Sequence, residues 1–264
     1  MSPIWRGAIS FGLVNIAVRL HTATEEHDFH FHQIHRDDNG RIRYKRVCEE
    51  CGKTVQQADI VKGYPLDDGS MITLEPTDFE ELPVSTDKSI EVLEFVPVAE
   101  VDPIYFQRTY YLEPDKAAIR PYVLLRETLR NSDRLGVVRI TIRQREQLAV
   151  LRVRDEVIAL HTMLWPDEIR TARFDVLRDA EDPRKNELTM AGTLVENMAG
   201  EFHPDEHTDE YREALGRLIE AKAAGKKAPA RTPRRKPAEP ADLADALQRS
   251  VEATKKPGRR KKTA

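Results

Sequence analysis

The segment that decides the fold is residues 135–164, which read LGVVRITIRQREQLAVLRVRDEVIALHTML. Apolar and polar side chains alternate along it with the period of two that is typical of β-strands. Val138, Ile140 and Ile142 share one parity. We therefore predict a sheet with one face on a core and an arginine face directed away from it. The arginine face consists of the polar residues of the other parity, Arg139, Thr141, Arg143 and Arg145.

The chain on both sides of this segment has the pattern of a mainly β fold with some helices. Gly12 falls inside the first apolar run, where we expect a bulge or a bend. Asn39 and Gly40 form a turn signal ahead of another alternating run. Strands are predicted at residues 9–20, 41–47, 70–74, 90–96 and 104–112, a short helix or turn at 75–82, and longer helices at 115–130, 187–198 and 209–225. A second turn is predicted at Asp67, Asp68 and Gly69, and Asp209 can cap the last of these helices.

The formal net charge of -3 conceals a strong division along the chain. Residues 221–264 contain 14 Lys and Arg against 4 Asp and Glu, a balance of +10, whereas residues 1–220 have a balance of -13. A basic tail on an acidic body indicates polyanion binding, although a tail that only aids solubility has the same composition. The Pro- and Ala-rich residues 228–240 predict a disordered linker. In the tail we assign DNA binding to Arg234, Arg235, Lys236, Arg259, Arg260, Lys261 and Lys262.

A second group of basic residues lies within residues 36–53, which we call the basic segment. Alternation along residues 41–47 predicts that Arg41, Arg43 and Lys45 share one face of a strand. Several positive charges that displace condensed counterions are what sequence-independent phosphate binding requires. A solvated edge strand, protected from pairing by its charges, would show the same pattern. The candidate DNA-binding residues of the basic segment are Arg36, Arg41, Arg43, Lys45, Arg46 and Lys53.

Two histidines and two cysteines have a spacing that resembles a zinc site. His32 and His35 are followed by Cys48 and Cys51, and the turn between the two pairs would bring them together. The alternatives are solvated histidines beside a reduced, unmetallated CxxC turn, or a redox CxxC, for which the surrounding sequence has no βαβ pattern. We expect that the protein requires no cofactor and that zinc, where these four residues bind it, has a structural role.

The sequence contains none of the short motifs that build a nucleotide site or an activated nucleophile. GxxxxGK[ST], GxGxxG, GxSxG and HExxH are all missing, which argues against an enzyme. The sequence has no run of 18 apolar residues, so no membrane span is predicted. Because the N-terminus has no signal-peptide pattern and the two cysteines are spaced as CxxC, we expect a cytoplasmic protein associated with the nucleoid.

Several ordered blocks of the sequence resemble the bacterial Ku family of DNA double-strand-break end joining. The first block, WRGAISFGLVNI at residues 5–16, is similar to the N-terminal signature of that family. The resemblance as a whole covers residues 3–225. Later blocks that resemble the family are RIRYKRVCEECG at 41–52, DIVKGY at 59–64, YREAL at 211–215 and EAK at 220–222.

This resemblance implies a Ku-type β-barrel core with an extended bridge, a helical C-terminal arm and a disordered basic tail. We expect the core at residues 1–180 with the bridge at about 25–62, the arm with a partner-contact segment at 181–225, and the tail at 226–264. Two chains would form a homodimeric ring that linear double-stranded DNA threads without sequence preference. The ring would recruit a multifunctional ATP-dependent DNA ligase for non-homologous end joining. The candidate ligase contact is Tyr211, Leu215, Leu218 and Ile219.

Two other functions are open on the sequence alone. One is a zinc-containing nucleic-acid enzyme or regulator that uses the two histidines and the two cysteines. The other is a nucleoid-associated protein that binds DNA mainly through its tail. Metal analysis of the purified protein and removal of the tail charges would separate these functions from a non-catalytic DNA-end-binding ring.

Overall fold

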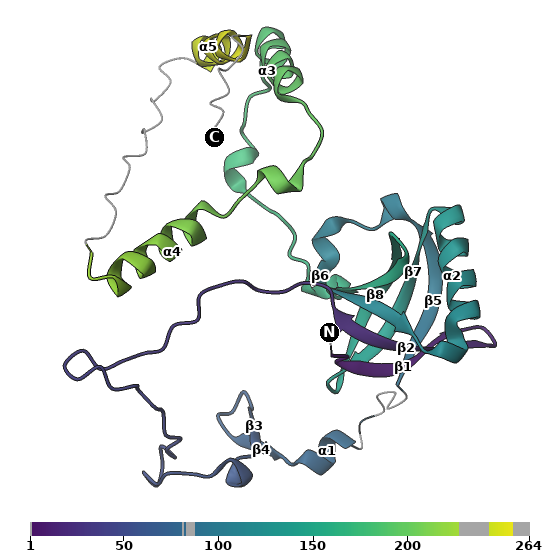
Figure 1. Ribbon diagram of the computed structural model, residues 1–264, viewed down its shortest axis with the longest axis vertical. Helices are drawn as coiled ribbons and strands as arrows, with labels where there is room; N and C mark the ends of the chain where they lie inside the picture. The colour runs from purple at the N-terminus through teal and green to yellow at the C-terminus, as the bar shows by residue number, and fades with distance from the viewer. Residues whose placement is uncertain (1, 81, 83–87, 227–242, 256–264) are drawn as a thin grey trace. The chain divides into compact units, whose positions relative to one another are not determined.

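The computed structural model describes residues 2–80, 82, 88–226 and 243–255 (Figure 1). The chain divides into two compact units, Met1–Thr171 and Ala172–Ala264. Of the predicted tail, the linker at residues 228–240 and the terminal basic run lie outside the described residues.

The first unit contains a closed barrel of seven strands in the order β1-β2-β6-β9-β8-β7-β5 (Figure 1). Neighbouring strands are antiparallel except β1 and β5, which close the barrel as a parallel pair starting at Ala8 and Ser89. The predicted β-barrel core is therefore confirmed. Its strands are β1 Trp5–Phe11, β2 Val14–Thr22, β5 Ser89–Pro97, β6 Phe106–Pro114, β7 Arg134–Ile142, β8 Arg145–Arg154 and β9 Val157–Met163.

The hydrophobic core fills the inside of the barrel with alternate residues of its strands. Val138 and Ile140 of β7 are almost fully buried, as the alternation of this segment predicts. The helix α2, Ile119–Ser132, follows a 3-10 turn at Lys116–Ala118. Its buried residues Tyr122, Leu125 and Leu129 belong to the same core cluster. One helix thus covers apolar surface that a barrel of this size would otherwise expose.

The first apolar run folds differently from the prediction of one strand with a bend. Residues 9–20 contribute to two strands, because β1 and β2 form a hairpin in which Phe11 pairs with Val14. Gly12 occupies the hairpin loop with φ of +57°, a conformation that glycine adopts without steric cost. The glycine therefore reverses the chain instead of bending a single strand.

The described residues between β2 and β5, which are 23–80, 82 and 88, form no core of their own. No residue of 24–80 is buried, and the regular structure is limited to short elements. The predicted turn around Gly69 is confirmed, with Asp68 accepting a hydrogen bond from the Ser70 backbone N–H at 2.9 Å. The elements are a 3-10 turn at Gln57–Asp59, β3 Lys62–Pro65, β4 Met71–Leu74 and α1 Pro76–Glu80.

The second unit is helical. As predicted, Asp209 caps α4 by accepting a hydrogen bond from the Arg212 backbone N–H at 3.0 Å. Two other helices, α3 and α5, pack against each other and lie side by side in Figure 1. Among the described residues, no helix combines the length and apolar composition that crossing a bilayer requires. The helices are α3 Lys185–Met198, α4 Glu210–Ala223 and α5 Leu243–Lys255.

Short 3-10 turns complete the two units. Those at Val98–Glu100 and Pro103–Tyr105 connect β5 to β6, and Asp102 caps the second of them through the Ile104 backbone N–H at 2.9 Å. The remaining turns follow β9 and flank α3, at Pro166–Glu168, Asp175–Leu177 and Pro204–Glu206.

The buried hydroxyl of Tyr122 predicts an alkaline loss of stability. It donates to the Leu112 carbonyl and accepts from the Ile158 N–H, both at 2.7 Å. Tyr122→Phe is expected to cost about 2 kcal/mol at neutral pH, because a buried donor and acceptor lose their partner. Burial raises the pKa of Tyr122 above its ordinary 10.0, although the Ile158 hydrogen bond and Arg126 oppose the shift.

Tyr122 therefore ionises at a lower pH in the unfolded chain than in the folded protein. The neutral hydroxyl contributes fully to the free energy of unfolding below about pH 10, and this contribution is lost as the pH rises towards the folded-state pKa. Urea unfolding of both proteins between pH 8 and 11 measures this effect. We expect the difference in free energy of unfolding between wild type and Tyr122→Phe to shrink above about pH 10, and a constant difference would contradict the assignment.

Candidate nucleic-acid interface

The six basic side chains of the basic segment are all exposed to solvent. Within the described part of the chain, none of them forms an ion pair with an acidic side chain. Their charges are therefore available to an external anion. This arrangement fits the phosphate-binding role that we predict for Arg36, Arg41, Arg43, Lys45, Arg46 and Lys53.

Two tight loops shape the backbone of the basic segment. In the first, the His35 N–H donates to the Gly40 carbonyl at 2.8 Å, and Asn39 has φ of +57°, so the predicted turn is confirmed. In the second, the Cys48 N–H donates to the Lys53 carbonyl at 2.9 Å. Gly52 closes this loop with φ of +65°. Local hydrogen bonds thus organise a segment that has no core.

The strand predicted at residues 41–47 is not formed. Only single bridges flank it, between Ile34 and Arg41 and between Val47 and Thr54. Residues 41–47 pair with no neighbouring strand, so alternate side chains do not line the two faces of a sheet. Arg41, Arg43 and Lys45 therefore need not lie on the same side. The prediction was wrong because the segment has charges on one parity but no buried surface on the other.

The two histidines and two cysteines of the predicted zinc set are not brought together within one chain. Among the described residues, no group of three or more His, Cys, Asp or Glu side chains is placed to hold a metal ion. His35 instead contacts Asp38, with Nδ1 and Oδ1 3.0 Å apart. Hydrogen bonds from Cys51, chiefly its backbone N–H, lower the pKa of the Cys48 thiol. Zinc binding by His32, His35, Cys48 and Cys51 stays a prediction.

The arginine face predicted on the sheet is divided by the hairpin between β7 and β8. Ile142 pairs with Arg145, and the loop between them consists of Arg143 and Gln144. Residues directly opposite each other in an antiparallel pair lie on the same face. Arg145 therefore lies on the side of Ile142, opposite to Arg139. A two-residue loop resets the alternation, which continuous counting along the sequence does not take into account.

Arg139 is less available for phosphate binding than its position in the sequence indicates. Its side chain forms ion pairs with Glu91 at 3.6 Å and with Glu146 at 3.8 Å. Glu91 and Arg139 are also direct partners in the β5–β7 pairing. The two carboxylates reduce the local positive potential, so Arg139 is a weaker candidate for phosphate binding than Arg143 or Arg145.

Arg143 and Arg145 line a pocket of about 590 Å³ that we call the barrel mouth. It lies at one end of the barrel, near the N-terminal part of β6 and the C-terminal part of β9, whereas Tyr122 of α2 contacts Leu112 and Ile158 at the other ends of these strands. Every lining residue belongs to the described part of the chain, and none is acidic. The barrel mouth is lined by Ile4, Thr22, Gln107, Arg108, Tyr110, Ile142, Arg143, Arg145, Gln147 and Thr162.

Arg108 is the residue of this pocket that the sequence analysis missed. It shares the parity of Tyr110 and Leu112, both of which are buried in the core. An arginine at a core-facing position of a strand is unusual unless the strand end meets water or an anion. That break in the apolar parity is the sequence signal that could have identified it.

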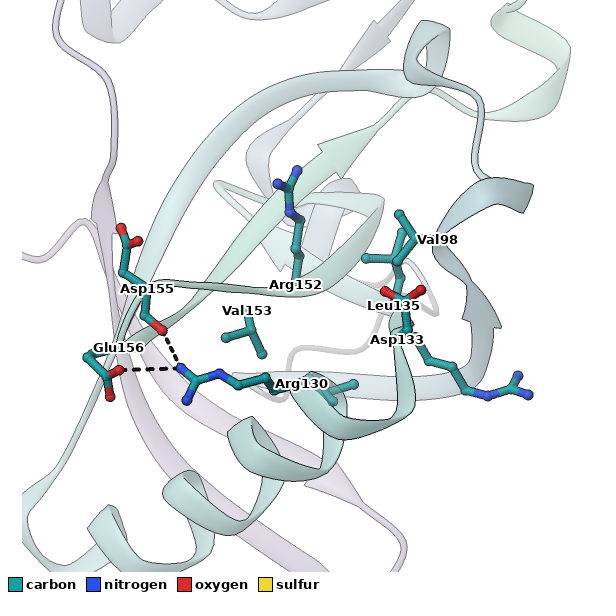
Figure 2. Close-up of a pocket in the computed structure, with 10 residues that line it drawn as sticks. Val98, Arg130, Asp133, Leu135, Arg152, Val153, Asp155 and Glu156 are labelled. Atoms are coloured by element: carbon teal, nitrogen blue, oxygen red, sulfur yellow. Dashed lines mark hydrogen bonds and ion pairs between the residues drawn. The ribbon is translucent and has the colours of Figure 1, made fainter. Parts of the chain in front are cut away.

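A second pocket, at the C-terminal end of α2, has a charge-balanced lining (Figure 2). Arg130 pairs with Glu127 at 3.2 Å and with Glu156 at 3.5 Å, and it also donates to the Asp155 carbonyl. Asp133, at the end of α2, lines the same pocket. Arg130 has acidic and carbonyl partners, so it stabilises the connection of α2 to the β8–β9 turn. The pocket is a poor anion site, because its three arginines share it with three acidic residues, Asp133, Asp155 and Glu156.

The predicted partner contact on α4 is partly open to solvent. Tyr211 is 75% exposed and Ile219 is 37% exposed, while Leu215 and Leu218 are half-buried. The stripe therefore offers apolar surface in a single chain, and its role as a ligase contact stays a prediction. The predicted DNA-binding residues of the tail, Arg234, Arg235, Lys236, Arg259, Arg260, Lys261 and Lys262, lie outside the described residues.

Comparison with known proteins gives consistent similarities along the chain. The family model described as the Ku70/Ku80 beta-barrel domain matches residues 10–190. A curated protein of Saccharopolyspora erythraea named "Non-homologous end joining protein Ku 2" is 56% identical over 272 residues, which cover 100% of this chain and 88% of the relative. A protein of Mycobacterium tuberculosis named "Non-homologous end joining protein Ku" is 47% identical over 264 residues, 97% of each chain. "Protein Ku" of Mycobacterium phage Omega is 45% identical over 224 residues, 84% of this chain and 79% of the relative.

Proposed function

Since this chain belongs to the bacterial Ku family, we propose that it is a non-catalytic protein that binds the ends of linear double-stranded DNA during non-homologous end joining. In this proposal two chains form a ring around the duplex, and the ring recruits an end-joining DNA ligase. The names of the relatives support the pathway. The described surface supports the mode of binding.

The observation that carries the proposal is the set of six exposed basic side chains of the basic segment without acidic partners. The six residues lie in no helix or regular strand that could enter a groove of DNA and read base edges. Contacts to phosphates alone are independent of sequence. The negative balance of residues 1–220 favours binding confined to local basic surfaces, because the rest of the body repels DNA.

A homodimer is supported by the composition of the segment between β2 and β5. It exposes large apolar side chains, including Phe31 at 69%, Tyr64 at 61% and Met71 at 62%. Residues 24–80 of this segment include no buried residue, and exposed apolar groups on such a surface are typical of association with another chain. The exposed stripe of α4 supports a protein partner in the same way, and we propose the ligase for it.

Comparison of linear and covalently closed circular duplex of the same sequence tests the proposal. We expect the full-length protein to bind the circle at least about tenfold more weakly, a difference of ~1.4 kcal/mol, because a closed circle offers no end to thread. Band shifts at several salt concentrations measure both affinities. Equal affinity for the two forms would contradict the end-binding ring.

A tail variant separates the ring from a tail-driven DNA-binding protein. In this variant the seven basic tail residues assigned to DNA binding are changed to glutamine in the full-length chain. The ring predicts that the preference for linear DNA survives, since the ring selects the end and the tail adds only non-specific attraction. Loss of most affinity for both forms would favour the nucleoid-associated alternative.

A further inference from the structure

We propose that the barrel mouth is a binding site for a single phosphate group of DNA, held by Arg108 and Arg145 with Arg143 at its rim. This inference rests on the proposed function and adds a discrete phosphate subsite on the barrel to it. The ligand is identified by its chemistry, an anion with oxygen acceptors, and it is either a 5′-terminal phosphate or a phosphodiester of the duplex.

The first argument is the uncompensated charge of the mouth. Three arginines line one pocket, and no acidic residue lines it. Within the described part of the chain, the arginines that form ion pairs are Arg19, Arg126, Arg130, Arg139, Arg154, Arg178 and Arg217, so the three of the mouth are not among them. Positive charges that share a pocket repel one another, and a bound anion removes that repulsion.

The second argument is the position of the polar residues on the strands. Arg145 lies on the same face as Ile142, and Gln147 pairs with the buried Ile140. Arg108 has the parity of the buried Tyr110. Apolar residues at these positions would lengthen the core, yet the sequence places two arginines and an amide there. A polar site at the end of the barrel accounts for that choice, because the half-buried Gln147 needs hydrogen-bond partners and the exposed Arg108 and Arg145 can offer their donors to a ligand in the pocket.

The third argument is that the backbone holds Arg108 in place. The β6–β9 pairing shifts register between Phe106 and Thr109, so a bulge interrupts the ladder beside Arg108. The buried Thr162 hydroxyl accepts a hydrogen bond from the Arg108 N–H at 3.2 Å and donates to the Arg108 carbonyl at 3.4 Å. A bulge that re-aims a side chain and is fixed by a side-chain hydroxyl is typical of functional sites.

The fourth argument is the conformation of the β7–β8 loop. Arg143 and Gln144 have φ of +51° and +63°, in the left-handed region that favours glycine and asparagine. A loop of Asn and Gly would adopt this conformation with less strain. Residues held in such conformations cluster at sites where a ligand is bound. The strained loop places Arg143 at the rim of the mouth.

The chemistry of the lining fits a phosphate group. Guanidinium groups donate paired hydrogen bonds that match the oxygens of a phosphate. The amides of Gln107 and Gln147 can donate further hydrogen bonds. The pocket volume of about 590 Å³ also leaves room for the sugar to which the phosphate is attached.

The test uses the full-length protein with both Arg108 and Arg145 changed to glutamine. The matched control changes Arg120 and Arg152, which are also exposed and form no ion pair with an acidic side chain within the described part of the chain. We expect the mouth variant to bind linear duplex about tenfold or more weakly and to lower the slope of log K against log salt by about one, since the single lost phosphate contact contributes about 0.9. The control variant is expected to change the slope by less than about 0.5.

Two duplexes distinguish the source of the phosphate. If the mouth holds a terminal phosphate, the mouth variant loses affinity for 5′-phosphorylated ends and not for 5′-hydroxyl ends. If the mouth holds a phosphodiester, the mouth variant loses affinity for both duplexes to the same extent. Either result supports the site, whereas a mouth variant that matches the control on both duplexes overturns it.

A readout without DNA separates this inference from the proposed function. Inorganic pyrophosphate, compared with sodium chloride at equal ionic strength, is expected to raise the unfolding midpoint of the wild type and of the control but not of the mouth variant, because a ligand stabilises the state that binds it. An equal rise in all three proteins overturns the site even if the preference for linear DNA is found. A selective rise supports the site even if that preference is missing.

Discussion

Changing the six basic residues of the basic segment to glutamine is expected to weaken binding to linear duplex about a thousandfold at 0.2 M salt, ~4 kcal/mol. Each phosphate contact contributes about 0.9 to the slope of log K against log salt, so six lost contacts lower this slope by about five. The physical cause is that fewer condensed counterions are released when the protein binds. A salt series of band shifts from 0.05 to 0.3 M measures both quantities.

The fold of this variant should be unchanged, which makes the result interpretable. All six residues are exposed, and within the described part of the chain none forms an ion pair with an acidic side chain. Circular dichroism and thermal unfolding are therefore expected to match the wild type. The tail variant removes a similar number of positive charges and is the matched control. If both variants lose affinity equally, the segment has no special role and total charge alone determines binding.

Gly7→Ala is expected to destabilise the barrel by about 3 kcal/mol or more. A Cβ atom at this position would overlap the Lys88 carbonyl oxygen and the Trp5 ring. The same carbonyl accepts the Ala8 N–H at 2.9 Å, next to the parallel pairing of β1 and β5 that closes the barrel. Trp5 is itself anchored by a hydrogen bond from Nε1 to the Thr141 carbonyl at 3.0 Å. Relief of the overlap must therefore separate β1 from β5 or displace the indole.

Urea unfolding followed by tryptophan fluorescence measures this loss, because Trp5 lies at the closure of the barrel. The control is Gly192→Ala in α3, where no heavy atom lies within 4 Å of the new Cβ. Alanine is the better helix former, so this control is expected to be neutral or to stabilise by up to about 1 kcal/mol. A Gly7→Ala protein with the unfolding midpoint of the wild type would show that β1 and β5 are not closely paired.

The sequence identified most elements whose pattern is local. Residues 90–96 and 104–112 were predicted as strands and form most of β5 and β6, and Asp209 was predicted to cap α4. These patterns depend on the period of side-chain burial or on a hydrogen bond within four residues, both of which are visible along the chain. The failures at residues 9–20 and 41–47 have the opposite cause. Pairing with a distant strand, or its absence, decided what those residues form.

For the candidate site, residue type was predictable and placement was not. The basic segment was recognisable from its charges alone, because exposure of uncompensated Lys and Arg requires no particular fold. Arg139 and Arg145 lie on opposite faces of the sheet, and this could be known only from the loop at Arg143 and Gln144, where two residues in the left-handed region reverse the chain. Arg108 is brought to that loop only by the pairing of β6 with β9 and of β9 with β8.

The sequence by itself determined the class of this protein: a mainly β core, a helical C-terminal part, a charge division from -13 to +10, and blocks that resemble Ku. The tertiary structure alone decided which charges share a site. Arg108 and Arg145 are 37 positions apart, yet they line one pocket because β6, β9 and β8 are neighbours in the barrel. Local periodicity sets the face of each strand, but the order of strands is set by long-range pairing that buries one common core.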